Sequence, residues 1–422
     1  MSDRPRVWIT GLGLVTAAGI GLDAFRVGIR QRTSPVRAID RFDATPFRSQ
    51  VAAQIDDFDP AAFMDHRSVR GMDRFSQFAV AAGRLAMDDA HFEPGRPDGV
   101  GAERIGIYLG SALGGVSFAE EQHERFLERG IRSVSPTLAL AVFGGAAPAN
   151  LGIALGVRGP ILSTANSCAS GAVALGEALH AIQAGTIDAA VAGGVECPLS
   201  PLAFGAFDVI RALADHHNDQ PEQACRPFDV ERSGFVLGEG AALLVLEEAE
   251  AARRRGAVPY AELRGYGSTT DAFHMVQPRP DGTDAARSVQ IALADAGDAP
   301  AAMDYVNAHA SSTPLGDAAE SVALALALGE HAVQVPISGT KAFTGHPLGA
   351  TAAIEAALSA LVIRDGWAPP SLNLVEPDPE IGERLPGLIR DPDGLPGRYE
   401  RVLSTSFGFG GLNSALVLGA PV

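Results

Sequence analysis

Short apolar runs typical of strands alternate along the chain with longer runs that have helical spacing. The strand-like runs include residues 6–15 (RVWITGLGLV), 104–113 (RIGIYLGSAL), 188–196 (DAAVAGGVE), 305–309 (YVNAH) and 401–411 (RVLSTSFGFGG). Strands that alternate with helices are typical of proteins in which helices cover a sheet. The pattern therefore predicts an α/β fold.

Two segments, 159–185 and 333–366, repeat one plan: a strand, a polar turn with a reactive side chain, and a helix of small residues. Apolar residues recur three or four positions apart in both helices, at Ala172, Leu175, Leu179 and Ile182 in the first, and at Ile354, Leu358, Leu361 and Val362 in the second. A strand running into a double glycine follows each segment. We predict a duplicated architecture in which the two related turns face each other.

No clean linker separates the two halves, which we place at residues 1–255 and 256–422 and expect to interleave as one unit. The chain has 422 residues, of which 46% are hydrophobic and 20% are charged. This composition is sufficient for a large core and argues against disorder.

The formal charge of -17 argues against a nucleic-acid partner, because binding phosphates requires a basic surface. An acidic protein partner would need a local basic patch. The three cysteines are sparse and lack zinc-site spacing, which favours the reducing cytoplasm and free thiols.

One uncharged stretch, residues 133–157, has the composition of a membrane segment. Pro136, Pro148 and Asn150 interrupt it, so we interpret it as a buried region. The first residues lack the pattern of a signal peptide, and we expect no export and no membrane partner.

Cys168 lies where a strand-like run meets a helix-like run, in STANSCASG. Free N–H groups and the dipole at a helix start favour a thiolate, so the thiol pKa is expected below its ordinary value of about 8.5. The alternative is a small buried core residue, the usual state of a cysteine inside cells. We interpret Cys197 and Cys225, which open no helix, as structural.

Two of the ten histidines stand at turns that can face Cys168. His309 ends a strand in NAHASST, and His346 lies in GTKAFTGHPLG, the turn that pairs with the cysteine turn. An imidazole N–H can polarise a carbonyl or stabilise an anion. The glycine-rich residues 408–413 could present backbone N–H groups to an oxyanion, or form a plain turn.

The motifs NSCASG, NAHASSTPLGD, GTKAFTGHPLGA and SFGFGGLN, in this order, resemble those of the elongating β-ketoacyl-acyl carrier protein synthases. The resemblance extends over essentially the whole chain. It implies a thiolase-like fold of two α/β halves in a layered αβαβα core, with the active site between them. It also implies decarboxylative condensation of an acyl group with malonyl-acyl carrier protein, without a cofactor or metal.

The resemblance implies the catalytic roles. Cys168 would accept the acyl group, and His309 and His346 would hydrogen-bond the malonyl thioester carbonyl. Lys341 would support them, paired with Glu320. The backbone N–H groups of Cys168 and Phe409 would bind the oxyanion, and the Phe409 ring would act as a gate.

Substrate and carrier contacts are implied in the same way. The implied substrate-binding residues are Ser311 and Thr313 beside the pantetheine arm, Leu113 on the acyl tunnel, Glu320 and Gly410. The implied carrier-docking residues are Arg67, Arg70, Arg74, Arg129 and Arg132, for which an ordinary solvated surface is the alternative. The family implies a dimer, with an identical chain or with a chain-length partner.

Several positions depart from the family pattern, namely Ser167, Ala310, Ser311 and Leu412. They keep every catalytic group but lie near the pantetheine and acyl paths. Fatty-acid elongation and the catalytic subunit of a type II polyketide or polyene pathway are therefore both retained as hypotheses. A thiolase is disfavoured because no cysteine follows Arg226, and an initiating synthase because His346 stands where asparagine is expected.

Overall fold

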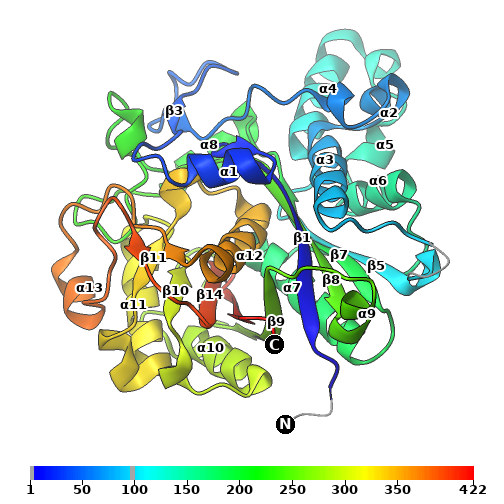
Figure 1. Ribbon diagram of the computed structural model, residues 1–422. Helices are drawn as coiled ribbons and strands as arrows, with labels where there is room; N and C mark the ends of the chain where they lie inside the picture. The colour runs from blue at the N-terminus through cyan, green and yellow to red at the C-terminus, as the bar shows by residue number, and fades with distance from the viewer. Residues whose placement is uncertain (1–3, 96–99) are drawn as a thin grey trace.

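The computed structural model describes residues 4–95 and 100–422 (Figure 1). The main elements of the N-terminal half are β1 (Val7–Thr16), α3 (Arg74–Asp89), β5 (Ile105–Gly110), α6 (Ala146–Leu155), β6 (Ile161–Thr164), α7 (Ser170–Gln183), β7 (Ala189–Glu196) and β8 (Gly240–Glu248). Those of the C-terminal half are β9 (Ala261–Thr270), α10 (Thr283–Ala296), β10 (Tyr305–Ala308), α11 (Pro314–Leu328), β11 (Ile337–Gly339), α12 (Leu348–Asp365), β14 (Arg401–Gly408) and β15 (Leu412–Gly419).

Shorter elements lie between the main ones. They are β2 (Gly19–Ile20), α1 (Leu22–Gly28), β3 (Arg37–Ala38), β4 (Val51–Ala52), α2 (His66–Gly71), α4 (Val116–Arg129), α5 (Leu138–Ala141), α8 (Pro201–Val209), α9 (Ala249–Arg254), β12 (Trp367–Ala368), α13 (Pro379–Arg384) and β13 (Leu395–Pro396). Three one-turn 3-10 helices bear on the site: η3 (Ile131–Ser133), η4 (Ser167–Ala169) and η8 (Lys341–Phe343).

The two halves have the same order of main elements and the same strand pairing. In the first, β5 is parallel to β6 and β7, and β8 then runs antiparallel between β7 and β1. In the second, β10 is parallel to β11 and β14, and β15 runs antiparallel between β14 and β9. The duplication predicted from two segments thus extends over each half.

The halves join edge to edge where β1 pairs antiparallel with β9, from Val7 opposite Leu263 to Ile9 opposite Ala261. The strand order is therefore continuous, β11-β10-β14-β15-β9-β1-β8-β7-β5-β6. Strands from both halves contact the same two central helices, α7 and α12.

The layers follow the predicted αβαβα order. Figure 1 shows α7 and α12 in the middle, with α3 and α6 outside the first half and α10 and α11 outside the second. Both central helices contact β7 of the first half and β15 of the second. Every residue of α12 from Leu348 to Val362 is buried, which explains why its residues, apart from Glu355, are small or apolar on every face.

The double glycine Gly193–Gly194 lies inside β7, and a side chain at Gly194 would collide with the carbonyl oxygen of Gly349 in α12. One sequence expectation was wrong in detail. Residues 133–157 are not uniformly buried, since the side chains of Phe143 and Ile153 are 50% and 81% exposed. Within the described residues, none of the helices has the length and apolar character needed to cross a bilayer.

Because α7 lies in the middle layer, a substitution that leaves a cavity beside it is predicted to lower the free energy of unfolding strongly. Leu175→Ala removes a fully buried side chain in the cluster shared with α12, and we expect a loss of about 2 to 5 kcal/mol in unfolding free energy. The matched control is Leu326→Ala on α11, where the leucine is half exposed, with an expected change of about 0.5 kcal/mol or less. Thermal and urea unfolding measure both; equal losses would contradict the central role of α7.

Candidate active site

Cys168 lies in η4, the single turn that connects β6 to α7, as the sequence predicted. The preceding residue, Ser167, has a φ of 54°, a left-handed conformation unusual for a residue with a side chain. Ser170 stabilises this turn, because its hydroxyl donates to the Ser167 carbonyl at 2.6 Å and accepts from the Asn166 N–H at 2.8 Å. The sulfur is thereby held at the start of a buried helix.

Two groups from the C-terminal half contact the sulfur directly. His346 Nε2 lies 3.1 Å from Cys168 Sγ, and the backbone N–H of Phe409 hydrogen-bonds to it. The other ring nitrogen of His346, Nδ1, lies 2.8 Å from Thr351 Oγ1 in α12. The ring also packs edge-on against Phe235, with centroids 5.1 Å apart. The His346 ring is therefore fixed on two sides.

His309 follows β10 directly and completes the cluster. Its ring centroid lies 5.4 Å from that of His346, and one ligand-type atom from each of Cys168, His309 and His346 lies within 4.8 Å of the others. Lys341 Nζ lies 3.3 Å from His309 Nδ1. A lysine ammonium can only donate, so Nδ1 accepts and Nε2 carries the ring proton.

Lys341 is fully buried and has three acceptors around it. It donates to the His309 carbonyl and to Glu355 Oε1, the latter at 2.6 Å, besides contacting His309 Nδ1. Its carboxylate partner is thus Glu355, and the predicted pairing with Glu320 was wrong. Glu320 instead accepts from the N–H groups of His309 and Ala310, at 2.8 and 2.6 Å, and so holds the turn after β10.

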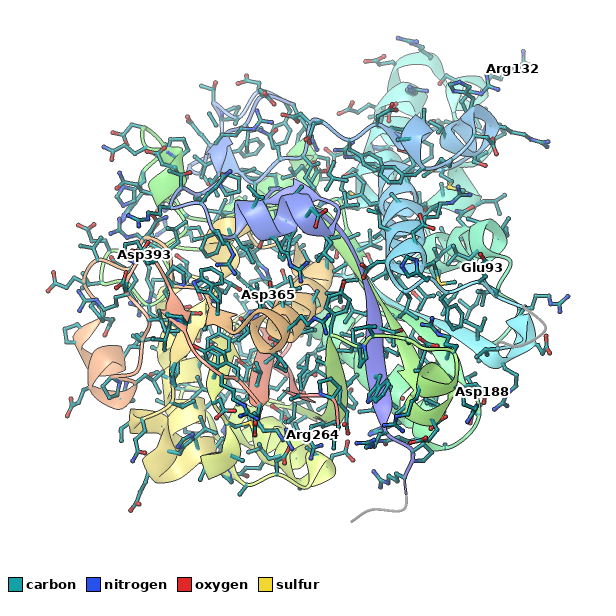
Figure 2. The ribbon with its side chains drawn as sticks, in the orientation of Figure 1. Glu93, Arg132, Asp188, Arg264, Asp365 and Asp393 are labelled. Atoms are coloured by element: carbon teal, nitrogen blue, oxygen red, sulfur yellow. The ribbon has the colours of Figure 1, made fainter. Side chains whose placement is uncertain are left out.

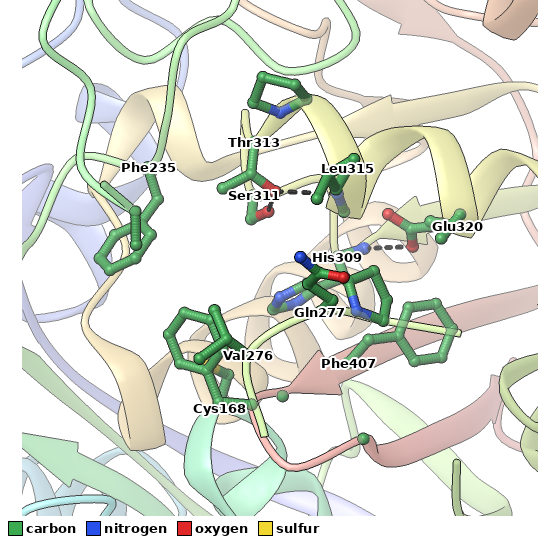
Figure 3. A pocket seen from close by; sticks show the side chains of 18 of the residues that line it. Cys168, Phe235, Val276, Gln277, His309, Ser311, Thr313, Leu315, Glu320 and Phe407 are labelled. Atoms are coloured by element: carbon green, nitrogen blue, oxygen red, sulfur yellow. Dashed lines mark hydrogen bonds between the residues drawn. The ribbon is translucent and has the colours of Figure 1, made fainter. Parts of the chain in front are cut away.

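A cavity of about 330 Å³ leads to the cluster. Figure 3 shows Cys168, His309 and the paired hydroxyls of Ser311 and Thr313 lining it, with the two hydroxyl oxygens 2.9 Å apart. Phe409 also lines this space. The cavity therefore joins the sulfur and imidazole cluster to the residues predicted to contact pantetheine.

Burial dominates the acid–base properties of the cluster. The Cys168 thiol is 4% exposed, and desolvation raises its pKa to about 11 despite the Ser167 hydrogen bond and the Lys341 charge. The expected lowering of this pKa was wrong for the resting site. Desolvation and then the Lys341 charge hold the pKa of both His309 and His346 well below the ordinary value. At neutral pH the thiol and both imidazoles are therefore uncharged.

Residues 4–252 match the family model of the beta-ketoacyl synthase N-terminal domain, and residues 260–375 match that of its C-terminal domain. The chain belongs to the β-ketoacyl synthase family. A Coxiella burnetii protein named 3-oxoacyl-[acyl-carrier-protein] synthase 2 is 40% identical over 417 residues, which cover 99% of each chain. The resemblance seen in the sequence is confirmed.

Solved structures of this family superpose along the whole chain. The ishigamide ketosynthase/chain length factor has a TM-score of 0.91 and 31% identity, and covers 100% of each chain. A ketosynthase bound to a hexaketide and in complex with its type II polyketide acyl-carrier protein has a TM-score of 0.88 and 32% identity, over 99% of this chain and 100% of the other. The predicted thiolase-like ketosynthase fold is confirmed.

The remaining predicted residues lie outside the cluster. Leu113 is 36% exposed and does not line the cavity, and the Gly410 N–H donates to the Met275 carbonyl at 2.8 Å. Among the predicted docking arginines, Arg74 bonds to the buried carboxylate of Glu239 at 3.0 Å and lies over the Phe78 ring. It is a structural residue of this network rather than a free docking group.

The other four arginines of the predicted docking set lie on three surface elements. Arg67 and Arg70 belong to α2, Arg129 ends α4, and Arg132 belongs to η3. Figure 2 shows Arg132 pointing outward at the upper right of the molecule, the region where Figure 1 labels α2. Their carrier-docking role stays a prediction.

Two buried carboxylates of the site went unrecognised in the sequence. Glu355 binds Lys341. Glu196, at the end of β7, accepts hydrogen bonds from the Ala112 N–H at 2.6 Å, from the two neighbours of Ala112 in the turn after β5, and from the Gly349 N–H at 3.0 Å. The available signal was a single charge in an apolar stretch, AAIEAAL for Glu355 and AGGVEC for Glu196. A buried charged side chain must be paired or hydrogen-bonded, so a single charged residue in an apolar stretch is a candidate functional-site residue.

Glu196 and Glu320 come from different elements, the end of β7 and helix α11, but bind equivalent turns in the two halves. Glu196 binds the turn after β5, and Glu320 binds the turn after β10 that carries His309. Glu196 also ties its turn to the first residues of α12, close to His346. Each half thus uses one buried carboxylate to hold the turn that follows its first parallel strand.

Burial raises the pKa of Glu196 to about 7, with the hydrogen bonds to Ala112 and Leu113 opposing it in part. The folded chain then binds a proton that the unfolded chain releases at its ordinary pKa near 4.5, so stability falls as pH rises from about 4.5 to 7. Glu196→Gln should remove part of this slope, up to about 3 kcal/mol over that window. Urea unfolding between pH 4.5 and 7.5 measures it, with exposed Glu177→Gln as the control; an unchanged slope would refute the assignment.

Proposed function

We propose that this chain catalyses decarboxylative condensation of an acyl group, carried as a thioester on Cys168, with malonyl-acyl carrier protein. The observation that carries the proposal is the sulfur with His346 Nε2 at 3.1 Å, the Phe409 N–H bonded to it, and His309 in the same cluster. The names of the curated relatives support the 3-oxoacyl-[acyl-carrier-protein] synthase 2 activity. The free cysteines agree with action in the cytoplasm.

Acyl loading begins from the neutral thiol. His346 Nε2 is the nearest base, so it takes the thiol proton as sulfur attacks the thioester carbonyl of the acyl carrier. The oxyanion that forms accepts from the N–H groups of Phe409 and Cys168. Collapse of this intermediate breaks the carrier's carbon–sulfur bond, and the proton held by His346 goes to the departing carrier thiol.

Decarboxylation and condensation use the imidazole donors. His309 Nε2–H, whose proton position Lys341 sets, donates to the malonyl thioester carbonyl and stabilises the enolate as carbon dioxide leaves. A hydrogen bond from His346 to the same oxygen assists when its Nε2 carries a proton. The enolate carbon attacks the acyl-Cys168 carbonyl, and sulfur leaves as a thiolate that takes up one proton from solvent to regenerate the thiol. The product is the β-ketoacyl carrier.

The cavity mouth supports a carrier-bound substrate. Arg211 and Arg279 line the cavity, and we place the phosphate at the head of a pantetheine arm near them, with Arg279 also paired with Asp281 at 2.9 Å. Ser311 and Thr313 line the same cavity and offer hydroxyls to the amides of that arm. The exposed Arg211 offers a local positive charge to an acidic carrier, while the chain as a whole is acidic.

A partner chain is proposed at the open edge of β6. Ile161 and Leu162 on this strand are 46% and 39% exposed, and Leu140, Phe143 and Ile153 from the neighbouring segment are exposed too. Such apolar edges pair with another chain. The homodimer is the primary proposal, and the chain-length-factor neighbours support a heterodimer in a type II polyketide or polyene pathway as the second candidate.

Because Cys168 and His309 act in different steps, acyl loading and malonyl decarboxylation should be lost separately when one of them is replaced. His309→Ala should keep acyl transfer to Cys168 but lower malonyl decarboxylation by about 10²-fold or more, because the enolate loses a donor. Intact-protein mass spectrometry with a panel of acyl carrier thioesters measures loading, and carbon dioxide release from malonyl carrier measures the second step. His123→Ala, on the exposed surface of α4, is the control.

Cys168→Ala provides the second arm of this experiment. Acylation of the unmodified chain should be confined to Cys168 and absent in the variant. A label on Cys197 or Cys225, or equal loss of loading and decarboxylation in His309→Ala, would contradict the mechanism.

The β6 edge predicts that one added charge dissociates the dimer. Leu162→Asp should convert the chain from a dimer to a monomer in sedimentation velocity, because the charge would be buried against the partner. Leu326→Asp, at a half-exposed position of α11, is the matched control and should stay dimeric. A chain that is monomeric before mutation would favour the heterodimer, while a dimer untouched by Leu162→Asp would exclude this edge.

A further inference from the structure

The Cys168, His309 and His346 cluster has the ligand chemistry of a transition-metal site. Within residues 4–95 and 100–422, these three residues are the group of His, Cys and carboxylate side chains whose donor atoms lie close enough to share one ion. Tetrahedral Zn²⁺ with sulfur and imidazole ligands requires donor separations of about 3.3 to 3.6 Å. The observed range, from 3.1 Å to at most 4.8 Å, needs only small side-chain shifts to reach them.

His346 is already arranged as a metal ligand. Its Nδ1 lies 2.8 Å from Thr351 Oγ1, so Nδ1 can carry the ring proton and donate to that hydroxyl. Nε2 is then left with its lone pair directed at the sulfur side of the cavity. A second hydrogen bond of this kind is what orients metal-bound histidines in proteins.

His309 is arranged in the opposite way because of Lys341. The ammonium occupies the Nδ1 side of the ring at 3.3 Å, which makes Nδ1 an acceptor and puts the proton on Nε2, the nitrogen on the far side of the ring. Binding a metal through Nε2 would move this proton to Nδ1, where an N–H would meet the N–H groups of Lys341. One of the three ligands is therefore held in the wrong tautomer.

Lys341 has no room to relieve this conflict. It is 1% exposed, and its other hydrogens are directed to the His309 carbonyl and to Glu355 Oε1. Its positive charge acts on the Cys168 sulfur and on both imidazoles, and so it also opposes a divalent cation held between them in a buried site of low dielectric constant.

We propose that Lys341, beyond any role in catalysis, keeps Zn²⁺ and similar cations out of the Cys168, His309 and His346 cluster by fixing the His309 tautomer and placing a positive charge beside it. Metal binding would release the Cys168 thiol proton to solvent and transfer the His309 ring proton from Nε2 to Nδ1. Removal of Lys341 removes the barrier to the second step. The residue thereby protects a reactive thiol from metal poisoning.

The test is to remove the buried pair and measure metal binding directly. Lys341→Met with Glu355→Gln replaces both charges together, so that neither is left unpaired in the core. Lys341→Met alone is the second variant. Each folded protein, checked by circular dichroism and thermal unfolding, is titrated with Co²⁺ for the absorption of a cobalt–thiolate bond, and with Zn²⁺ by calorimetry.

We expect the unmodified chain to show no cobalt–thiolate absorption and the double variant to bind one metal, with affinity raised by about 100-fold or more. Adding Cys168→Ser to the variant should abolish the absorption. Both readouts are independent of acyl transfer, so the result does not depend on the proposed condensation.

The unmodified chain supplies an arm that does not depend on any variant folding. Equimolar Zn²⁺ should leave Cys168 open to alkylation by iodoacetamide, measured by intact mass. Protection of Cys168 by Zn²⁺ in the unmodified chain, or a folded double variant that binds no Co²⁺, would overturn the proposal.

Discussion

The buried ammonium of Lys341 is the interaction on which the geometry of the site depends. It joins three groups from two parts of the fold: the ring and the carbonyl of His309 after β10, and the Glu355 carboxylate in α12. An ammonium has only donors, so this one contact decides which nitrogen of His309 faces the substrate. Catalytic tautomer and resistance to metal therefore follow from the same charge.

Symmetry between the halves explains where this charge is needed. The turn before α7 carries Cys168, and the equivalent turn before α12 carries Lys341 and His346. Because α7 and α12 pack together in the middle layer, their starts bring sulfur and imidazole to 3.1 Å. A duplicated scaffold has thus acquired different chemistry at two equivalent positions.

Burial sets the protonation states more strongly than the start of the helix does. Desolvation raises the pKa of the Cys168 thiol to about 11 and lowers that of both histidines, so the resting cluster is uncharged apart from the Lys341 and Glu355 pair. A neutral thiol beside a neutral imidazole is stable until a substrate carbonyl arrives. The proton transfer that activates sulfur then occurs over one short contact.

The sequence by itself determined the fold class, the duplication and the identity of Cys168, His309 and His346, because local apolar spacing and short motifs encode strands, turns and reactive residues. The tertiary structure decided which side chains contact each other and which are buried. It paired Lys341 with Glu355 rather than Glu320, turned Arg74 inward to Glu239, and exposed Phe143 and Ile153. No local sequence pattern specifies which buried charged side chains form a pair, because the pairs form only when both halves pack around α7 and α12.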